Sequence, residues 1–252
     1  MDPLGTLRAV RRGLGFAAWT AGVVNAHRVC RRFDDTLAHH RGKQAFVDVW
    51  AKGVFPILGV DFTHVGGSLP HDLGPFLVIS NHRSPLDILI AQHMVGGVVL
   101  AHQGVADIPV IGDAAAYTDT VFVDREDSKS GAKAIRQLRR RLREGRNVVV
   151  FPEGTTFAGD EVRPFKRGAF TAAKGLAHVR VLPIGLAYRP GDEFADESFG
   201  DYSSRMSRGA STPVWATLGE PADVPRTADD EAKLRDVVQA LVDRSVAARH
   251  AS

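Results

Sequence analysis

The segment at residues 81–87, NHRSPLD, holds the residue types best suited to chemistry. It directly follows an apolar run from Phe76 to Ser80, which predicts a buried strand. A polar pair such as Asn81 and His82 at the end of a buried strand must find partners or face a cleft. Asp87 can fold back toward His82, orient its imidazole and stabilise the protonated form. The pair could therefore act as a general base on a substrate hydroxyl, as in triad chemistry without a protein nucleophile.

The same segment also has the features of a helix start. Ser84 is a good N-cap, Pro85 suits the first helical position, and Asp87 lies three residues after Ser84, close to a capping-box arrangement. These features account for three residues but leave Asn81 and His82 unexplained. We therefore expect a strand, a functional turn and a helix, in that order.

A second polar turn, FPEGTT from Phe151 to Thr156, follows another apolar run. Gly154 permits close backbone approach, and the loop could offer N–H groups to an oxyanion. Glu153 could bind acceptor hydroxyls or brace a neighbouring loop. Taken alone, a Pro-Glu-Gly sequence also fits an ordinary turn.

Short apolar runs alternate with helical stretches from Ile57 onward. The runs expected to form strands are Phe76–Ser80, Gly97–Ala101, Thr120–Val123, Asn147–Phe151, Val179–Ala187 and Pro213–Leu218. Helices are expected to start at Pro85, Ser128 and Lys166. This alternation predicts an α/β domain with a largely parallel central sheet flanked by helices. Both polar turns then follow strands, where clefts form.

Three parts are expected along the chain: an N-terminal helical element (1–56), the α/β domain (57–222) and a C-terminal amphipathic helix packed on that domain (223–252). The first part reads as one helical segment to about Arg32 and another from about Gln44 to Val54, which Pro56 stops. The C-terminal helix is expected from about Asp229 to Arg249, with Thr227 as its cap.

Charge and hydropathy near the N-terminus favour a membrane surface. Residues 1–60 hold nine Lys and Arg against four Asp and Glu, whereas the remainder holds 23 against 25. The uncharged stretch Gly13–Ala26 is shorter than the about 20 residues that span a bilayer. With Trp19, Phe16 and flanking arginines, it suits a helix in the headgroup layer of an anionic bilayer, where each basic residue adds roughly 1 kcal/mol. A core-packing helix is the alternative. Nucleic acid is the competing anionic partner, and we do not expect it.

Other sequence features exclude several classes of protein. Cys30 is the one cysteine, which rules out an internal disulfide and favours a reducing compartment. We therefore expect a peripheral protein on the cytoplasmic face of the cell membrane. The histidines show no recognised zinc spacing, so no metal site is expected. A G-x-G-x-x-A string at Gly13–Ala18 has no strand before it, and no G-x-S-x-G elbow occurs, which argues against a dehydrogenase and a serine hydrolase.

Taken together, the motifs resemble the glycerolipid acyltransferase family, best known through 1-acylglycerol-3-phosphate acyltransferases. Residues Asn81–Asp87 fit the family's Asn-His-x-Ser-x-x-Asp block, and Phe151–Thr155 fits its Phe-Pro-Glu-Gly-Thr block. Val121–Arg125 resembles the second block, and Leu182–Ile184 the fourth. The resemblance covers about Phe76 to Tyr188, with all four blocks in order.

The resemblance implies roles for particular residues. His82 would be the general base and Asp87 its partner. The candidates for substrate binding are Asn81, Arg83, Ser84, Arg125, Glu153, Gly154, Thr155, Thr156 and Lys166. Acyl-CoA or acyl carrier protein would supply the acyl group as a co-substrate, with no bound cofactor. The family's helical N-terminal element, which sits on the bilayer, agrees with the interpretation of residues 1–56.

These expectations give a function with open alternatives. The chain is expected to acylate a glycerolipid hydroxyl, with 1-acylglycerol 3-phosphate as acceptor and phosphatidate as product. One departure bears on the acceptor, since Thr156 replaces the Arg with which the family contacts a phosphate. Lys166 or Arg167 could supply that charge, or serve only as surface residues at a helix start. There are two alternatives. The enzyme could acylate another lipid or a glycolipid, or the chain could be a peripheral lipid-binding module without turnover.

Overall fold

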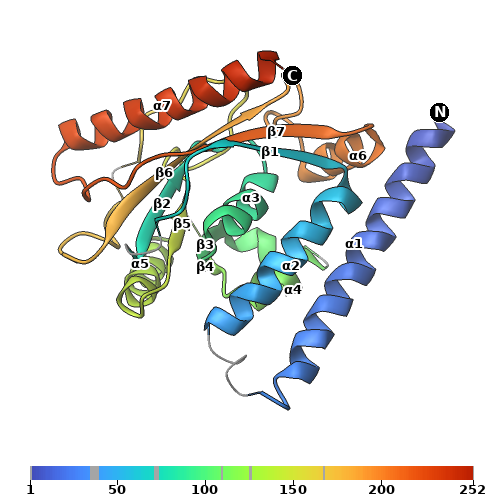
Figure 1. Ribbon diagram of the computed structural model, residues 1–252, viewed down its shortest axis with the longest axis horizontal. Coiled ribbons are helices and arrows are strands. Elements are labelled where there is room, and N and C mark those ends of the chain that lie inside the picture. Colours follow the sequence, from blue (N-terminus) through green and yellow to red (C-terminus); the bar gives the residue numbers. More distant parts are fainter. Residues whose placement is uncertain are drawn as a thin grey trace.

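A seven-stranded sheet forms the centre of the molecule (Figure 1). The strands are β1 (Val60–Gly66), β2 (Phe76–Ser80), β3 (Val98–His102), β4 (Val121–Val123), β5 (Val148–Val150), β6 (Arg180–Tyr188) and β7 (Thr212–Leu218). Their order across the sheet is β1-β7-β6-β2-β5-β3-β4, and all neighbours run parallel except β6 and β7. The predicted α/β fold with a largely parallel sheet is confirmed, and the six expected strands occur within one residue of their predicted ends.

The structure is a computed structural model that describes residues 2–34, 40–70, 74–108, 110–124, 127–166 and 168–251. Its helices are α1 (Pro3–Cys30), α2 (His40–Leu58), α3 (Leu86–Val95), η2 (Gln103–Asp107, a 3-10 helix), α4 (Ile111–Tyr117), α5 (Ser128–Arg143), α6 (Phe199–Arg208) and α7 (Ala228–Ala251). Among the described residues, no helix combines the length and the apolar composition needed to cross a membrane.

Strand β2 shows how the sheet is buried on both faces. Its five residues are all buried, and its four apolar side chains alternate between two hydrophobic clusters. Leu77 and Ile79 belong to the cluster that includes residues of α5 and α7, whereas Phe76 and Val78 belong to the cluster with α3. Strands buried on both faces read as continuous apolar runs, which is why β2 was visible in the sequence.

Helices α5 and α7 begin as the sequence predicted. In α5, Leu138 and Leu142 are buried in the core cluster under the sheet. At the start of α7, the Thr227 hydroxyl accepts a hydrogen bond from the Asp230 amide at 3.1 Å, while the Asp230 carboxylate accepts one from the Thr227 amide at 3.0 Å. This reciprocal pair is a capping box and confirms Thr227 as the cap.

Phe16 and Trp19, which the sequence suggested for membrane contact, are partly buried between α1 and α2. The Trp19 indole donates a hydrogen bond to the Trp50 carbonyl of α2 at 2.9 Å. It lies so close to Gly53 that a Cβ there would stand 2.2 Å from the ring. Phe16 also packs on the small core between α1 and α2. The exposed apolar side chains of α1 are instead Leu4, Leu7, Val10, Leu14 and Val29.

Arg12 ties α1 to α6 beside it (Figure 1). Its guanidinium is buried and donates hydrogen bonds to the carbonyls of Met206, Ser207, Gly209 and Ala210, at the C-terminal end of α6. A cation is favourable at this end of a helix because the unpaired carbonyls carry partial negative charge. Burial lowers the pKa of Arg12, with the nearby charges of Arg8 and Arg11 acting in the same direction.

Three element predictions need correction. Helix α2 runs through Pro56 to Leu58, and Gly59 with φ of 74° follows its end. A proline removes one amide donor from the last turn, but the helix can still continue for two more residues. No helix starts at Lys166, because successive turns occupy the described residues from Gly168 to Gly175. Strand β1 was not predicted, since it is a half-exposed edge strand without a continuous apolar run.

Candidate active site

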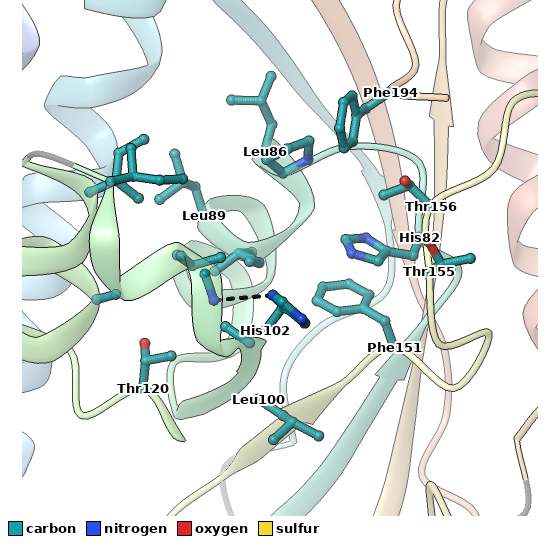
Figure 2. Close-up of a pocket in the computed structure, with 18 of the residues that line it drawn as sticks. His82, Leu86, Leu89, Leu100, His102, Thr120, Phe151, Thr155, Thr156 and Phe194 are labelled. Carbon is teal, nitrogen blue, oxygen red and sulfur yellow. Dashed lines mark hydrogen bonds between the residues drawn. The ribbon is translucent and has the colours of Figure 1, made fainter. Parts of the chain in front are cut away.

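The sheet brings the two polar turns to one edge. Strand β2 pairs with β5 in parallel, with Ile79 opposite Val150, so both strands end at the same place. The turn after β5 then contacts the turn after β2 directly. The Phe151 ring stacks on the His82 imidazole with centroids 4.1 Å apart, and the Phe157 amide donates to the His82 carbonyl at 3.1 Å. Figure 2 shows Phe151, Thr155 and Thr156 beside His82.

His82 and Asp87 form a hydrogen-bonded pair. Nδ1 of His82 lies 2.8 Å from Oδ2 of Asp87. Asp87 is fully buried in the first turn of α3, whereas the His82 side chain is 14% exposed and lines a cavity. Because Nδ1 is bonded to the carboxylate, Nε2 is the nitrogen that can take a proton from a bound molecule. The described arrangement is that of a base and its orienting carboxylate.

Asp87 also organises the turn that carries His82. Its Oδ2 accepts hydrogen bonds from the amides of Arg83 at 2.6 Å and Ser84 at 2.9 Å. The Ser84 hydroxyl accepts from the Leu86 amide at 3.0 Å and pairs with the Tyr202 hydroxyl at 2.5 Å. Helix α3 begins one residue later than expected, with Pro85 and not Ser84 at its N-cap. Since Ser84 is fully buried, this geometry favours a structural role over the predicted substrate contact.

Arg83 and Glu153 form a buried ion pair that joins the two turns. Arg83 Nη1 donates to Glu153 Oε2 at 2.8 Å, and its other nitrogens donate to the carbonyls of Gly159 and Glu161. Glu153 also accepts from the His82 amide at 2.6 Å. Both side chains are buried and their polar atoms are occupied. Of the two roles considered for Glu153, the geometry favours bracing the neighbouring loop, and it favours bracing for Arg83 as well.

Asn81 clamps β2 to β6. Its side-chain amide donates to the Leu186 carbonyl and accepts from the Leu186 amide, both at 2.8 Å. The side chain thereby continues the β2–β6 ladder past Ser80, where the strand ends. Asn81 is completely buried, so this position does not favour the predicted contact with substrate.

Gly154, Thr155, Thr156 and Lys166 lie at the cavity wall next to His82. Gly154 has φ of 81°, and the aliphatic stem of Lys166 crosses it so closely that a Cβ would stand 3.0 Å from Lys166 Cγ. The Gly154 amide donates to the Phe151 carbonyl at 3.0 Å, so it is not among the N–H groups that this loop could offer to an oxyanion. The structure therefore places Thr155 and Thr156 beside the histidine and Lys166 on the wall of the same cavity.

A cavity of about 1010 Å³ opens at this edge. Its walls are mostly apolar and include Leu86 and Leu89 from α3, Leu100 from β3, and Ile135 and Leu138 from α5. Sites for small ligands usually measure roughly 300–1,000 Å³, so this volume can take a long acyl chain. Among the described residues that line it, Lys166 is the one Lys or Arg.

Two predicted residues lie outside the described structure, and three residues near the site were not predicted. Arg125 and Arg167, two predicted cations, lie outside the described residues. Tyr188 and Tyr202 were not predicted, although Tyr188 donates to Asp87 Oδ1 at 2.6 Å. The sequence offered one sign of Tyr188: it directly follows the apolar run Val179–Ala187, so it lies at the end of a predicted strand. His102, at the end of β3, also lines the cavity, and its Nδ1 accepts from the Gly104 amide at 3.1 Å (Figure 2).

No metal-binding group of three or more His, Cys, Asp or Glu occurs in the part of the chain that the structure describes. The His82–Asp87 pair and the apolar cavity beside it can support base catalysis. A bound hydroxyl could lose its proton to His82 while an apolar chain fills the cavity.

Comparisons with known proteins agree with this geometry. A model of the family described as Acyltransferase matches residues 63–187. A 1-acyl-sn-glycerol-3-phosphate acyltransferase of Helicobacter pylori is 31% identical over 183 residues, which cover 71% of this chain and 72% of the relative. A lyso-ornithine lipid O-acyltransferase of Pseudomonas aeruginosa is 30% identical over 244 residues, which cover 94% of this chain and 88% of the relative.

One solved structure has the same fold over nearly the whole chain. The 1-acyl-sn-glycerophosphate acyltransferase PlsC of Thermotoga maritima gives a TM-score of 0.63 at 23% identity. The match covers 94% of this chain and 96% of that one.

Proposed function

The chain belongs to the acyltransferase family, and from this premise we propose that it transfers a fatty acyl group from acyl-CoA or acyl carrier protein to the free hydroxyl of 1-acylglycerol 3-phosphate. The product would be phosphatidate, which makes the reaction a step of phospholipid biosynthesis. The observation that carries the proposal is the His82–Asp87 pair, with His82 on the wall of an apolar cavity.

In the proposed mechanism, His82 acts first as a base. Nε2 takes the proton from the acceptor hydroxyl as its oxygen attacks the thioester carbonyl carbon. Asp87 holds the imidazole by Nδ1 and stabilises the imidazolium that forms. When the tetrahedral intermediate collapses, the C–S bond breaks and His82 returns the proton to the leaving thiolate. The ester, the free thiol and neutral His82 result, so protons and charges balance.

Thr155, Thr156 and Lys166 are the described polar side chains placed to bind the acceptor or the developing oxyanion. The Lys166 ammonium carries the positive charge that can pair with a phosphate, whereas a threonine hydroxyl is neutral. This supports a phosphate-bearing acceptor. The alternative acceptor is lyso-ornithine lipid, favoured by Thr156 in place of the family's arginine and by the relative from Pseudomonas aeruginosa.

The acceptor is tested by direct competition. Purified protein receives acyl-CoA with equal amounts of 1-acylglycerol 3-phosphate, lyso-ornithine lipid and a neutral lysolipid, and mass spectrometry identifies the products. We expect phosphatidate to predominate. Lys166→Ala should raise KM for the phosphate acceptor about tenfold, the effect of losing about 1.4 kcal/mol, whereas Lys133→Ala on the outer face of α5 should not. Predominance of ornithine lipid would overturn the acceptor and leave acyl transfer intact.

We also propose peripheral attachment to an anionic membrane surface through α1. Leu4, Leu7 and Leu14 recur at helical spacing on its outer side and are 70%, 66% and 68% exposed. Arg8 and Arg11 on the same helix supply positive charge. An exposed apolar stripe next to basic residues is typical of a helix that lies in the headgroup layer.

A further inference from the structure

A buried tyrosine contacts the catalytic pair from behind. Tyr188, the last residue of β6, is 1% exposed, and its hydroxyl donates to Asp87 Oδ1 at 2.6 Å. Neither the sequence motifs nor the proposed mechanism uses this residue. Asp87 Oδ2 takes the hydrogen bonds from His82, Arg83 and Ser84, so Tyr188 serves the other carboxylate oxygen.

The fold fixes Tyr188 in this place. Asn81 pairs with both backbone groups of Leu186, which extends the β2–β6 ladder by one step beyond Ser80. Side chains two residues apart on a strand point to the same face, so Tyr188 follows Ile184 and Leu186 on the face that carries α3. That face holds Asp87. The hydrogen bonds of Asn81 to Leu186 therefore fix the position along β6 at which the Tyr188 phenol meets the Asp87 carboxylate.

The phenol remains a donor throughout the working range of pH. Burial raises the pKa of Tyr188 well above its usual value of 10.0, and the negative charge of Asp87 raises it further. A neutral phenol beside a carboxylate can only donate its proton toward it. Such a donor withdraws charge from the carboxylate and so weakens its hold on a proton shared with the neighbouring imidazole.

We propose that Tyr188 is a positioning residue that orients Asp87 and sets the pH range in which His82 is free to act as a base. The inference rests on the proposed role of the His82–Asp87 pair. Other titratable or charged groups around the pair are Tyr202 from α6, Arg83 and Glu153 from the two turns, and His102 and Lys166 at the cavity. Arg249 of α7 donates to the Tyr188 carbonyl at 2.6 Å, a backbone contact that Tyr188→Phe keeps. The substitution removes the phenol hydroxyl and no other titratable group.

The first test is Tyr188→Phe, measured as kcat/KM against pH with acyl-CoA. Without the donor, Asp87 keeps more negative charge, and the pair binds its proton more tightly. The acid limb should move to higher pH by about one unit, the size expected for a hydrogen bond to a charged group. Activity should approach the wild-type value on the alkaline plateau. Tyr117→Phe removes a phenol that contacts His27 and not the carboxylate, so its acid limb should coincide with that of the wild type.

A second test works even if Tyr188→Phe does not fold. The chain has three tyrosines, so a Tyr117→Phe/Tyr202→Phe background leaves Tyr188 alone. Uniform labelling of that background with 3-fluorotyrosine makes the phenol more acidic and a stronger donor. The acid limb should then move to lower pH than in the same background with ordinary tyrosine, opposite in direction to the effect of Tyr188→Phe.

The outcomes separate this inference from the proposed mechanism. A Tyr188→Phe profile that overlays the wild type, or that falls equally at every pH, would show a structural role only. A fluorotyrosine profile that does not move, or that moves upward, would also overturn the inference. If His82→Ala retains wild-type turnover, the mechanism itself fails, whatever the tyrosine variants do.

Discussion

The carboxyl edge of the sheet buries polar side chains, whereas the outer side of α1 exposes apolar ones. At the sheet edge, Asp87 and Asn81 are fully buried, yet their polar atoms have hydrogen-bond partners. On α1, Leu7 and Leu14 face outward although they carry no polar atoms. Buried polar groups and exposed apolar patches both cost free energy in an isolated domain, so each invites an explanation by function. In our proposal the first prepares a reaction and the second contacts a lipid phase.

The largest expected effect tests whether the polar edge is catalytic. His82→Ala should remove base catalysis and lower kcat by about 10²- to 10⁴-fold, because Asp87 alone cannot take the hydroxyl proton at neutral pH. The measurement is acyl transfer from acyl-CoA, together with the melting temperature. His64→Ala on the edge strand β1 is the matched control and should keep its activity. A folded His82→Ala protein with wild-type turnover would make the buried network structural only.

The next effect concerns the stability that the same edge contributes. Arg83→Met leaves the Glu153 carboxylate buried without its cation, which should lower the free energy of unfolding by about 3–5 kcal/mol. Urea unfolding followed by circular dichroism measures it. Lys233→Met removes a cation from a pair between α7 side chains that are both largely exposed, so it should change stability little. Equal midpoints for the two variants would contradict the bracing role of Arg83.

The polar edge of the sheet could be located from the sequence because its motifs sit at strand ends. Residues 81–87 and 151–156 each follow a mostly apolar run, and such runs are the most readable elements of a parallel sheet. The partners of those motifs were not readable. Asn81 meets Leu186, more than 100 residues away, and Arg83 meets carbonyls in the segment after the second turn. Short motifs identify which residues matter, but only the fold shows which of them face the cavity.

The orientation of α1 could not be predicted for a different physical reason. Its apolar residues are distributed around the helix, with Phe16 and Trp19 on one side and Leu7 and Leu14 on another. The periodicity therefore shows an apolar helix without showing which side packs against α2. The small residue Gly53 in α2 decides it, since the Trp19 ring fits directly on its backbone. Large aromatic residues favoured a membrane role in the sequence, yet here they provide the packing.

The smallest expected effect tests the exposed side of α1. A Leu7→Ala/Leu14→Ala variant should bind vesicles containing anionic phospholipid about tenfold more weakly at low salt. Each substitution removes apolar surface worth roughly 0.8 kcal/mol per buried CH₂, and a helix in the headgroup layer buries only part of it. Co-sedimentation with vesicles measures the binding. Val237→Ala removes an exposed apolar side chain from α7 and is the matched control.

Trp19→Ala distinguishes the two sides of α1. Trp19 packs against Gly53 and donates to the Trp50 carbonyl. Its loss should therefore lower the melting temperature and affect vesicle binding less. The leucine variant should do the reverse, since its side chains make few contacts within the protein. If the leucine variant binds vesicles as well as the wild type, or if Val237→Ala weakens binding equally, the outer side of α1 is not the contact with lipid. In that case the exposed leucines of α1 would have no membrane role, and only the polar edge of the sheet would keep a proposed function.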